Sequence, residues 1–312
     1  MRTYRLLHPA ESPIKAVLIV AALLALLCGA TACAGPAAPA TVTPDPRTPT
    51  VTPAAVVVPP SPIPTATPVP ASPTVSASPS ATPSATATPA PPPKVPVLAY
   101  HMVGIPEGGD YNVSVEQFEE EMQWLHDNDY HTITPAQLLD AIREGAPLPP
   151  RPVIITFDDN QISPYLHAVP ILKRFGFTAS FFIMTVTIGK DGYMDADQIK
   201  DLADEGFTIG GHTWDHRILT QQIDSEVERQ LDLSGADLRA ILGHDPEYFA
   251  YPSGLYDQHI VDALKAHGYK MAFRLFSDDD PPVDPAFMVR RQIIPGGWSL
   301  DDFVPRVHWM EP

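Results

Sequence analysis

The 312-residue chain has only two cysteines, Cys28 and Cys33, and both lie near its beginning. A disulfide framework is therefore excluded for the rest of the chain, which must be stabilised by its own core. Basic residues are also few, with 20 Lys and Arg against 37 Asp and Glu, for a formal charge of −17. A field of that sign argues against nucleic acid as a partner and against binding to anionic lipid by charge.

Two sequence signatures of hydrolases are absent as well. The chain has neither a Gly-x-Ser-x-Gly nucleophile elbow nor the His-Glu-x-x-His pattern of a zinc protease. Residues 94–312 also contain no internal repeat. Any catalytic group must therefore come from another arrangement of residues.

Residues 1–33 have the pattern of an export signal. Basic residues precede an apolar run at Ala16–Leu27, which is shorter than the about 20 residues that a bilayer-spanning helix needs. Small residues then lead into Cys33 in a pattern that resembles a bacterial lipobox, in which the cysteine becomes the lipidated first residue of the mature chain. Two alternatives stay open: cleavage after Ala32 with release, or retention of an uncleaved anchor. All three export the rest of the chain.

Residues 34–93 form the second segment, with 19 prolines in 60 positions and only two charged residues, Asp45 and Arg47. This composition has no apolar periodicity and cannot pack, so we interpret it as a disordered, semi-rigid spacer in polyproline II conformation. Residues 94–312 remain, and their length suits a single α/β barrel domain.

After residue 94, apolar segments of strand length alternate with helical patterns, which predicts a parallel sheet built from βα units. Strands are expected at residues 95–100, 130–133, 152–157, 178–184, 207–210, 248–251, 269–274 and 289–294. Helices are expected at residues 164–175, 195–205, 224–242 and 258–267, and from Ser114, Thr134 and Ser299. Ser114 and Gln117 have the spacing of a capping box. Seven or eight such units are enough to close into a barrel.

In such a barrel, the chemistry lies at the carboxyl ends of the strands. Asp158 and Asp159 follow one predicted strand, and because neighbouring residues face opposite ways, one can bind a metal while the other acts as a base. The alternative is that the pair caps the next helix. His212 and His216 follow another strand, and a helical turn would place both imidazoles on one side. One Asp and two His with an open position are typical of a catalytic zinc site.

Three motifs now make the sequence similar to a known family, the polysaccharide deacetylases (NodB-homology, carbohydrate esterase family 4). They are TFDD at 156–159, HTWDH at 212–216 and FAYPSG at 249–254. Neighbouring segments also match the family pattern: YHMV at 100–103, ASFF at 179–182 and GYKMAF at 268–273. The resemblance covers residues 95–307 and is nearest to a YP-x-G branch that includes poly-N-acetylglucosamine deacetylases. The resemblance implies a distorted (β/α)7-type barrel, which agrees with the seven or eight βα units predicted above.

The resemblance also implies site roles. Asp158 matches the catalytic base, and the matching metal ligands are Asp159, His212 and His216. The metal would be zinc, with cobalt and nickel as alternatives. The reaction would be hydrolysis of N-acetyl or O-acetyl groups on a polysaccharide, which releases acetate.

The third motif would lie against the substrate through Tyr251, Pro252, Ser253 and Gly254, with a backbone N–H, that of Tyr251, holding the oxyanion. Trp214, inside the metal motif, either lines the sugar groove or packs against the barrel.

Several positions depart from the family pattern. Asn160 replaces a glycine, Ser253 replaces a tyrosine, and Ala250 replaces an arginine that orients the base. A guanidinium is expected instead from Arg290 or Arg291, with Arg291 favoured by local alignment; the alternative is a surface arginine pair.

The usual general-acid motif is also missing, because His308 in VHW matches it poorly and is expected to be structural. His101, at the end of the first strand, is the better candidate for the rim of the site, unless the backbone satisfies it. Asp158 is a further candidate to protonate the leaving amine.

Together these features predict an exported, monomeric deacetylase of N-acetylated polysaccharide, either anchored at the cell surface or secreted. The polysaccharide itself stays open among peptidoglycan, poly-N-acetylglucosamine, chitin-like chains and acetylated xylan. Two functions of another class also stay open. One is a non-catalytic carbohydrate-binding protein on a degenerate barrel; the other is a glycosidase with paired carboxylates, which would leave both histidines without a role.

Overall fold

The computed structural model describes residues 93–105, 109–275 and 283–309. The predicted export signal with Cys33 lies outside these residues, and so does the predicted spacer apart from residue 93. Both therefore stay predictions. No helix in the described part of the chain is long and apolar enough to cross a lipid bilayer.

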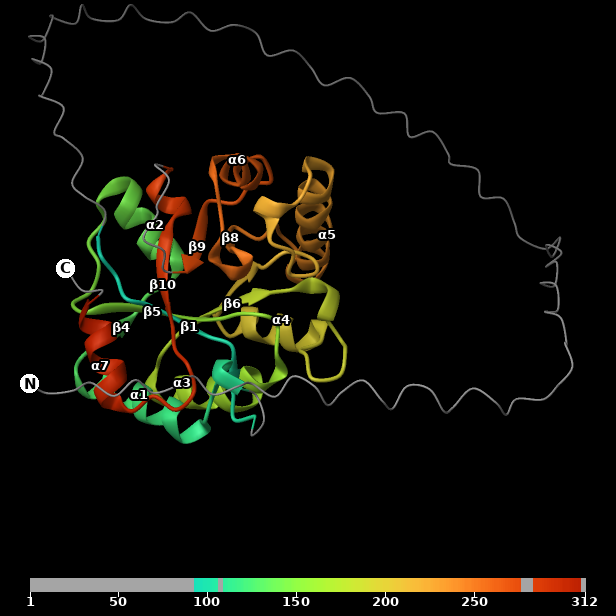
Figure 1. The fold of residues 1–312 in the computed structure, drawn as a ribbon. Coiled ribbons are helices and arrows are strands. Elements are labelled where there is room, and N and C mark those ends of the chain that lie inside the picture. Colours follow the sequence, from blue (N-terminus) through green and yellow to red (C-terminus); the bar gives the residue numbers. More distant parts are fainter. Residues whose placement is uncertain (1–92, 106–108, 276–282, 310–312) are drawn as a thin grey trace, which may run out of the picture. The chain divides into compact units, whose positions relative to one another are not determined.

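Seven parallel strands close into a ring, with the helices around its outside (Figure 1). In ring order they are β1 (Val97–Tyr100), β5 (Pro152–Phe157), β6 (Ser180–Ile183), β7 (Thr208–Gly211), β8 (Tyr248–Ala250), β9 (Met271–Leu275) and β10 (Val289–Ile293). β10 pairs back to β1 and completes the ring. The predicted barrel of the (β/α)7 type is confirmed.

Three short strands lie outside this ring. β4 (His131–Thr132) extends the sheet at the start of β5, and β2 (Met102–Val103) pairs with β3 (Asn112–Val113). β2 and β3 bring the segment after β1 back over the carboxyl end of that strand, which is the end where the chemistry of a barrel lies.

The helices are α1 (Val115–Asp127), α2 (Pro135–Glu144), α3 (Val169–Phe175), α4 (Ala196–Asp204), α5 (Asp224–Leu242), α6 (Gln258–Ala266) and α7 (Leu300–Trp309). A π-helical turn at Pro164–Ala168 leads into α3. The predicted bounds of β5 and α5 are confirmed, and most other elements are shorter than expected by a few residues.

The caps explain where several helices begin. Thr134 and Asp195 form full capping boxes with the residues three positions later. Ser114 accepts the N–H of Gln117 as expected, but the reciprocal half of that box is wrong. The Oε1 of Gln117 instead accepts the N–H of Gly297 at 2.8 Å, while its Nε2 donates to Glu121 and to the carbonyl of Pro295.

Alternate residues of each strand face the interior of the barrel and the surrounding helices. Ile154 and Phe182 belong to the cluster that fills the interior. Ile155 and Phe181, their neighbours in sequence, belong to the cluster that packs under the helices. Because every second residue of β5 faces the interior, Asp158 follows the strand on the same side as Ile154. The barrel therefore positions this carboxylate above its core.

Candidate active site

A cavity of about 240 Å³ opens where the carboxyl ends of the strands meet. Its lining includes His101, Asp158, Asp159, His212, His216 and Ser253. The structure thus brings together most of the site residues that the sequence predicted.

Three side chains in this cavity converge on one point. Asp159 Oδ1 lies 3.5 Å from His212 Nε2 and 3.5 Å from His216 Nε2. All three candidate ligand atoms lie within 4.8 Å of one another. Ligands at about 2.0–2.2 Å from a tetrahedral zinc are about 3.4 Å apart, so the spacing fits a divalent cation. Asp159 Oδ1 is buried and has no hydrogen-bond partner in the described part of the chain, which a cation would supply.

The two histidines are held differently. His212 is buried at the end of β7, and its Nδ1 lies 2.7 Å from the carbonyl of Ala250. That contact places the proton on Nδ1 and leaves Nε2 free to bind a metal. The helical turn predicted for this motif is wrong, because Thr213 and His216 have left-handed backbones with φ of 63° and 65°. His216 therefore comes from a bent loop, and its side chain is 37% exposed.

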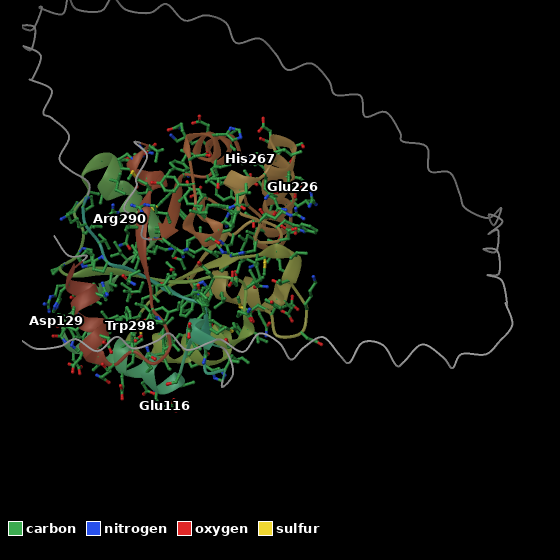
Figure 2. The ribbon with its side chains drawn as sticks, viewed as in Figure 1. Glu116, Asp129, Glu226, His267, Arg290 and Trp298 are labelled. Carbon is green, nitrogen blue, oxygen red and sulfur yellow. The ribbon has the colours of Figure 1, made fainter. Side chains whose placement is uncertain are left out.

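Asp158 forms a bidentate ion pair with Arg291. Both carboxylate oxygens lie 2.7 Å from guanidinium nitrogens, and the two side chains are buried. Burial opposes ionisation of Asp158, but the Arg291 charge outweighs it and holds the pKa of this carboxyl well below its usual range. Arg291 thus contributes the guanidinium that Ala250 lacks, while Arg290 next to it is exposed (Figure 2). Asp158 has this partner instead of capping a helix.

His101 lies in the same cavity at the end of β1. Its ring centroid is 4.9 Å from that of Tyr111, and its Nδ1 is buried without a hydrogen-bond partner in the described residues. The alternative in which the backbone satisfies Nδ1 is therefore wrong. Burial lowers the pKa of the imidazole. His308 lies on α7 beside Trp124 and does not line the cavity.

The third motif corrects one expectation. The N–H of Tyr251 donates to the carbonyl of Phe273 at 3.0 Å, as part of the pairing between β8 and β9, and so is not free for an oxyanion. Ser253 is exposed and lines the cavity, with φ of 58° and ψ of 9°. Its N–H forms no hydrogen bond with another described residue.

Pro252 and Gly254 of this motif are not part of the cavity lining. Both are buried. Gly254 has φ of 73°, and a Cβ at this position would lie 2.5 Å from the backbone nitrogen of Leu275. Only glycine fits there without a shift of β9, so the motif's glycine sets the close approach of this turn to the strand.

Residues 145–272 match the sequence model of the polysaccharide deacetylases. The chain is 31% identical over 180 residues to YxkH of Bacillus subtilis, which is assigned to this group; the match covers 58% of this chain and 64% of that protein. It is 28% identical over 199 residues to a poly-β-1,6-N-acetyl-D-glucosamine N-deacetylase of Staphylococcus aureus, covering 59% and 68% of the two chains.

The fold is similar to that of the Streptococcus pyogenes deacetylase PplD, with a TM-score of 0.64, 24% identity and coverage of 71% of this chain and 100% of that one. The barrel is therefore similar in sequence to the polysaccharide deacetylases, and its fold is similar to that of a solved deacetylase. One departure noted in the sequence has a local explanation. Asn160 keeps the left-handed backbone of a glycine position, with φ of 63°, and its amide donates to Thr187 and to the carbonyl of Met194.

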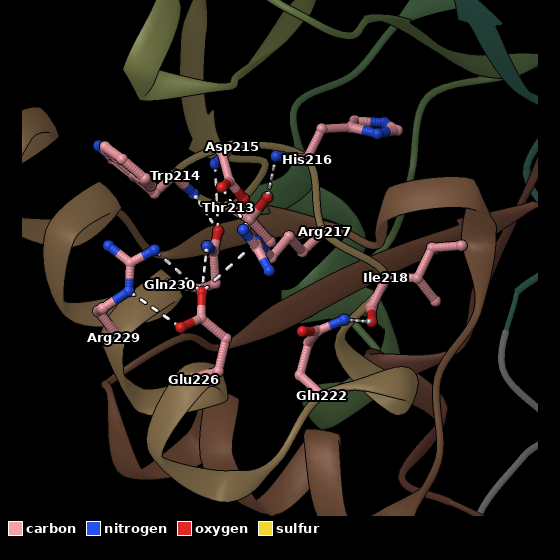
Figure 3. A network of polar contacts seen from close by, with 10 residues as sticks. All are labelled: Thr213, Trp214, Asp215, His216, Arg217, Ile218, Gln222, Glu226, Arg229 and Gln230. Atoms are coloured by element: carbon pink, nitrogen blue, oxygen red, sulfur yellow. Dashed lines mark hydrogen bonds and ion pairs between the residues drawn. The ribbon is translucent and has the colours of Figure 1, made fainter.

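Trp214 lies outside the cavity and outside the clusters that form the core of the described barrel, so its predicted place along a sugar groove stays a prediction. Its ring instead packs beneath the Arg229 guanidinium, 4.7 Å from ring centroid to carbon (Figure 3).

Sequence reasoning missed two residues near this site, Tyr111 and Gln230. Tyr111, half-exposed at the cavity rim, precedes β3, and its aromatic ring in the segment after the first strand was the available signal. Gln230 lies behind the metal motif on α5, and nothing in the sequence distinguishes it from other helical glutamines.

Proposed function

We propose that this barrel hydrolyses acetyl groups of an extracellular polysaccharide, N-acetyl groups foremost, and releases acetate. One observation carries the proposal: Asp159, His212 and His216 converge beside an ionised carboxylate, Asp158, in one cavity. The match to the polysaccharide deacetylase model and the similarity to a poly-N-acetylglucosamine deacetylase support this substrate class. A glycosidase would use only the two carboxylates.

The three converging residues would hold a divalent metal, for which imidazole and carboxylate ligands favour zinc, with cobalt and nickel as alternatives. Such an ion supplies Lewis acidity, polarising the acetyl carbonyl and acidifying water. Asp158 holds the attacking water and accepts its proton. Arg291 keeps that carboxylate ionised and fixes both of its oxygens in place.

Two further residues complete the reaction. Ser253 lines the cavity, and its N–H, which forms no hydrogen bond with another described residue, would donate to the carbonyl oxygen as negative charge develops there. As the C–N bond breaks, the nitrogen takes up the proton that Asp158 accepted from water, either directly or through the imidazole of His101, which leaves a free amine on the sugar and acetate. The unpartnered Nδ1 of His101 supports this role. Burial of a polar atom without a hydrogen-bond partner costs free energy, and a catalytic role explains why it is retained.

The location of the enzyme is part of the proposal. Residues 1–33 would export the chain, Cys33 would carry the lipid anchor unless the protein is released, and residues 34–93 would separate the monomeric barrel from the membrane. An extended spacer of this length reaches at most on the order of 190 Å.

Acetate release tests the activity directly. The protein is stripped with a chelator, reloaded with zinc, and incubated with poly-N-acetylglucosamine, chitin oligomers, peptidoglycan and acetylated xylan. We expect zinc-dependent acetate release from at least one N-acetylated polymer. New reducing ends without acetate would replace the proposal with a glycosidase, and bound metal with no product from any polymer would favour the carbohydrate-binding protein.

A further inference from the structure

One side chain of α5, that of Gln230, forms hydrogen bonds with the backbone of the loop that carries His216. Gln230 is fully buried, and its Oε1 accepts the N–H groups of Trp214 and Asp215, both at 3.1 Å (Figure 3). These are consecutive backbone donors between the two candidate histidine ligands. In this bent loop, neither donor has a strand or helix partner of its own.

The other end of Gln230 is fixed as well. Its Nε2 donates to Glu226 Oε1 at 2.9 Å, one turn earlier on α5. Glu226 in turn accepts two hydrogen bonds from Arg229, each at 3.0 Å, and these bonds together with that from Gln230 lower its pKa to about 2. An ionised Glu226 accepts and cannot donate, so the amide of Gln230 has only one favourable orientation, with its oxygen toward the loop.

The loop is also held at its carbonyl groups, because the N–H groups of Thr185 and Val186 donate to the carbonyls of Thr213 and Trp214 at 3.3 and 2.8 Å. Thr213 and His216 both adopt left-handed backbones, which for residues other than glycine persist only where the surroundings hold them. Thr213 Oγ1 accepts the N–H of His216 at 2.9 Å. His212, by contrast, continues directly from β7 and is held by the carbonyl of Ala250.

We infer that Gln230 is a positioning residue for the metal site, locking the loop so that His216 stays within reach of the ion shared with Asp159 and His212. The inference rests on the proposed function, because it assumes that these three residues bind a metal. Glu226 fixes the amide of Gln230 and also pairs with Arg217, the residue after His216, at 3.6 Å. Arg229 binds Glu226 and packs against the ring of Trp214. Without this lock, His212 keeps its place and His216 loses its own, so metal affinity falls while the barrel stays folded.

Cobalt titration of the chelator-stripped full-length protein tests this inference, since the visible absorption of Co²⁺ reports both affinity and ligand geometry. For Gln230→Met, which keeps the length of the side chain and removes both polar atoms, we expect the Kd for cobalt to rise about tenfold or more, with an altered band. The double variant Glu226→Gln, Gln230→Glu exchanges the two side chains. The amide at position 226 then donates to the carboxylate at position 230, so we expect most of the cobalt affinity to return. Gln230→Asn, which is one methylene too short, serves if Gln230→Met does not fold.

Leu238→Ala is the matched control, because it removes a buried core side chain from the same helix without touching the loop. We expect it to lower the unfolding temperature at least as much as Gln230→Met and to leave cobalt binding unchanged. If the glutamine variants bind cobalt with the affinity and band of the parent, Gln230 is purely structural and the inference is wrong. If the parent itself takes up no cobalt, the proposed function fails first and the inference with it.

Discussion

Two buried carboxylates of this barrel are stabilised in opposite ways. Asp158 has a guanidinium on both oxygens, and its pKa lies well below the usual range. Glu121, on α1, has only neutral partners: the hydroxyl of Tyr100 at 2.7 Å and the amide of Gln117 at 2.8 Å. Burial raises the pKa of Glu121 to about 7, which these two hydrogen bonds offset only in part.

The difference shows two uses of a buried carboxyl in one fold: the proposed proton transfer in the cavity, and structural support between elements of the core. A buried carboxyl beside a fixed cation stays charged and can accept a proton in a cavity, whereas one with neutral donors is stable as the acid and can link elements. Through Gln117, Glu121 ties α1 to the segment before α7, where Gly297 donates its N–H to the Gln117 side chain at 2.8 Å. The two carboxylates are also connected, because the N–H of Asp158 donates to the carbonyl of Tyr100.

The largest expected effect comes from removing the charge of the first carboxylate. Asp158→Asn keeps the shape of the side chain and removes its ability to accept a proton, so we expect kcat/KM for acetate release to fall by about 10²- to 10⁴-fold. Cobalt uptake should remain, because the three candidate ligands are untouched. Activity near that of the parent would show that Asp158 is not the base.

Removing the cation is expected to act on the fold as well. Arg291→Met leaves Asp158 buried without its partner, which destabilises a protein by about 3–5 kcal/mol. Urea unfolding at neutral pH measures the change. The double variant with Asp158→Asn is the control: without the uncompensated charge it should regain much of the lost stability, and equal losses in the single and double variants would contradict the ion-pair account.

Most residues of the candidate site were predictable from the sequence, but the role of Glu121 was not. Asp158, Asp159, His212 and His216 lie in short contiguous motifs after apolar strands, so strand ends alone bring them to one rim. The bounds of β5 and α5 were also predictable, because a continuous apolar run and a long amphipathic pattern leave few alternatives.

The features that the sequence did not predict depend on strand register and on partners far away in the sequence. Which N–H of the third motif is free depends on the pairing of Tyr251 with Phe273 across β8 and β9, which no local pattern encodes. The same holds for Gln117, whose side chain contacts Pro295, 178 residues away, rather than its own cap. Arg290 and Arg291 differ only in which way they face, and that is decided by the alternation of β10.

The second carboxylate should make stability depend on pH. Glu121 has a pKa of about 7 in the folded protein against 4.5 for a free side chain, so its contribution is complete below that lower value and is lost as pH rises through 7. The loss amounts to about 3 kcal/mol. In Glu121→Gln, which stays neutral, unfolding free energies between about pH 4.5 and 8 should lose this decline. Glu116→Gln, exposed on the same helix (Figure 2), should keep it.

The smallest expected effect isolates one donor to that carboxyl. Tyr100→Phe removes the hydroxyl that donates to Glu121 Oε2 and keeps the ring packed against Phe118 and Phe157. A hydrogen bond to a neutral acid stabilises by about 1 kcal/mol and one to a charged carboxylate by about 2 kcal/mol. Urea unfolding should therefore show a loss at about pH 5 that grows by about 1 kcal/mol at about pH 8. A loss of the same size at both values would mean that Glu121 does not titrate against Tyr100, and the contrast with Asp158 would then lie in the cation alone.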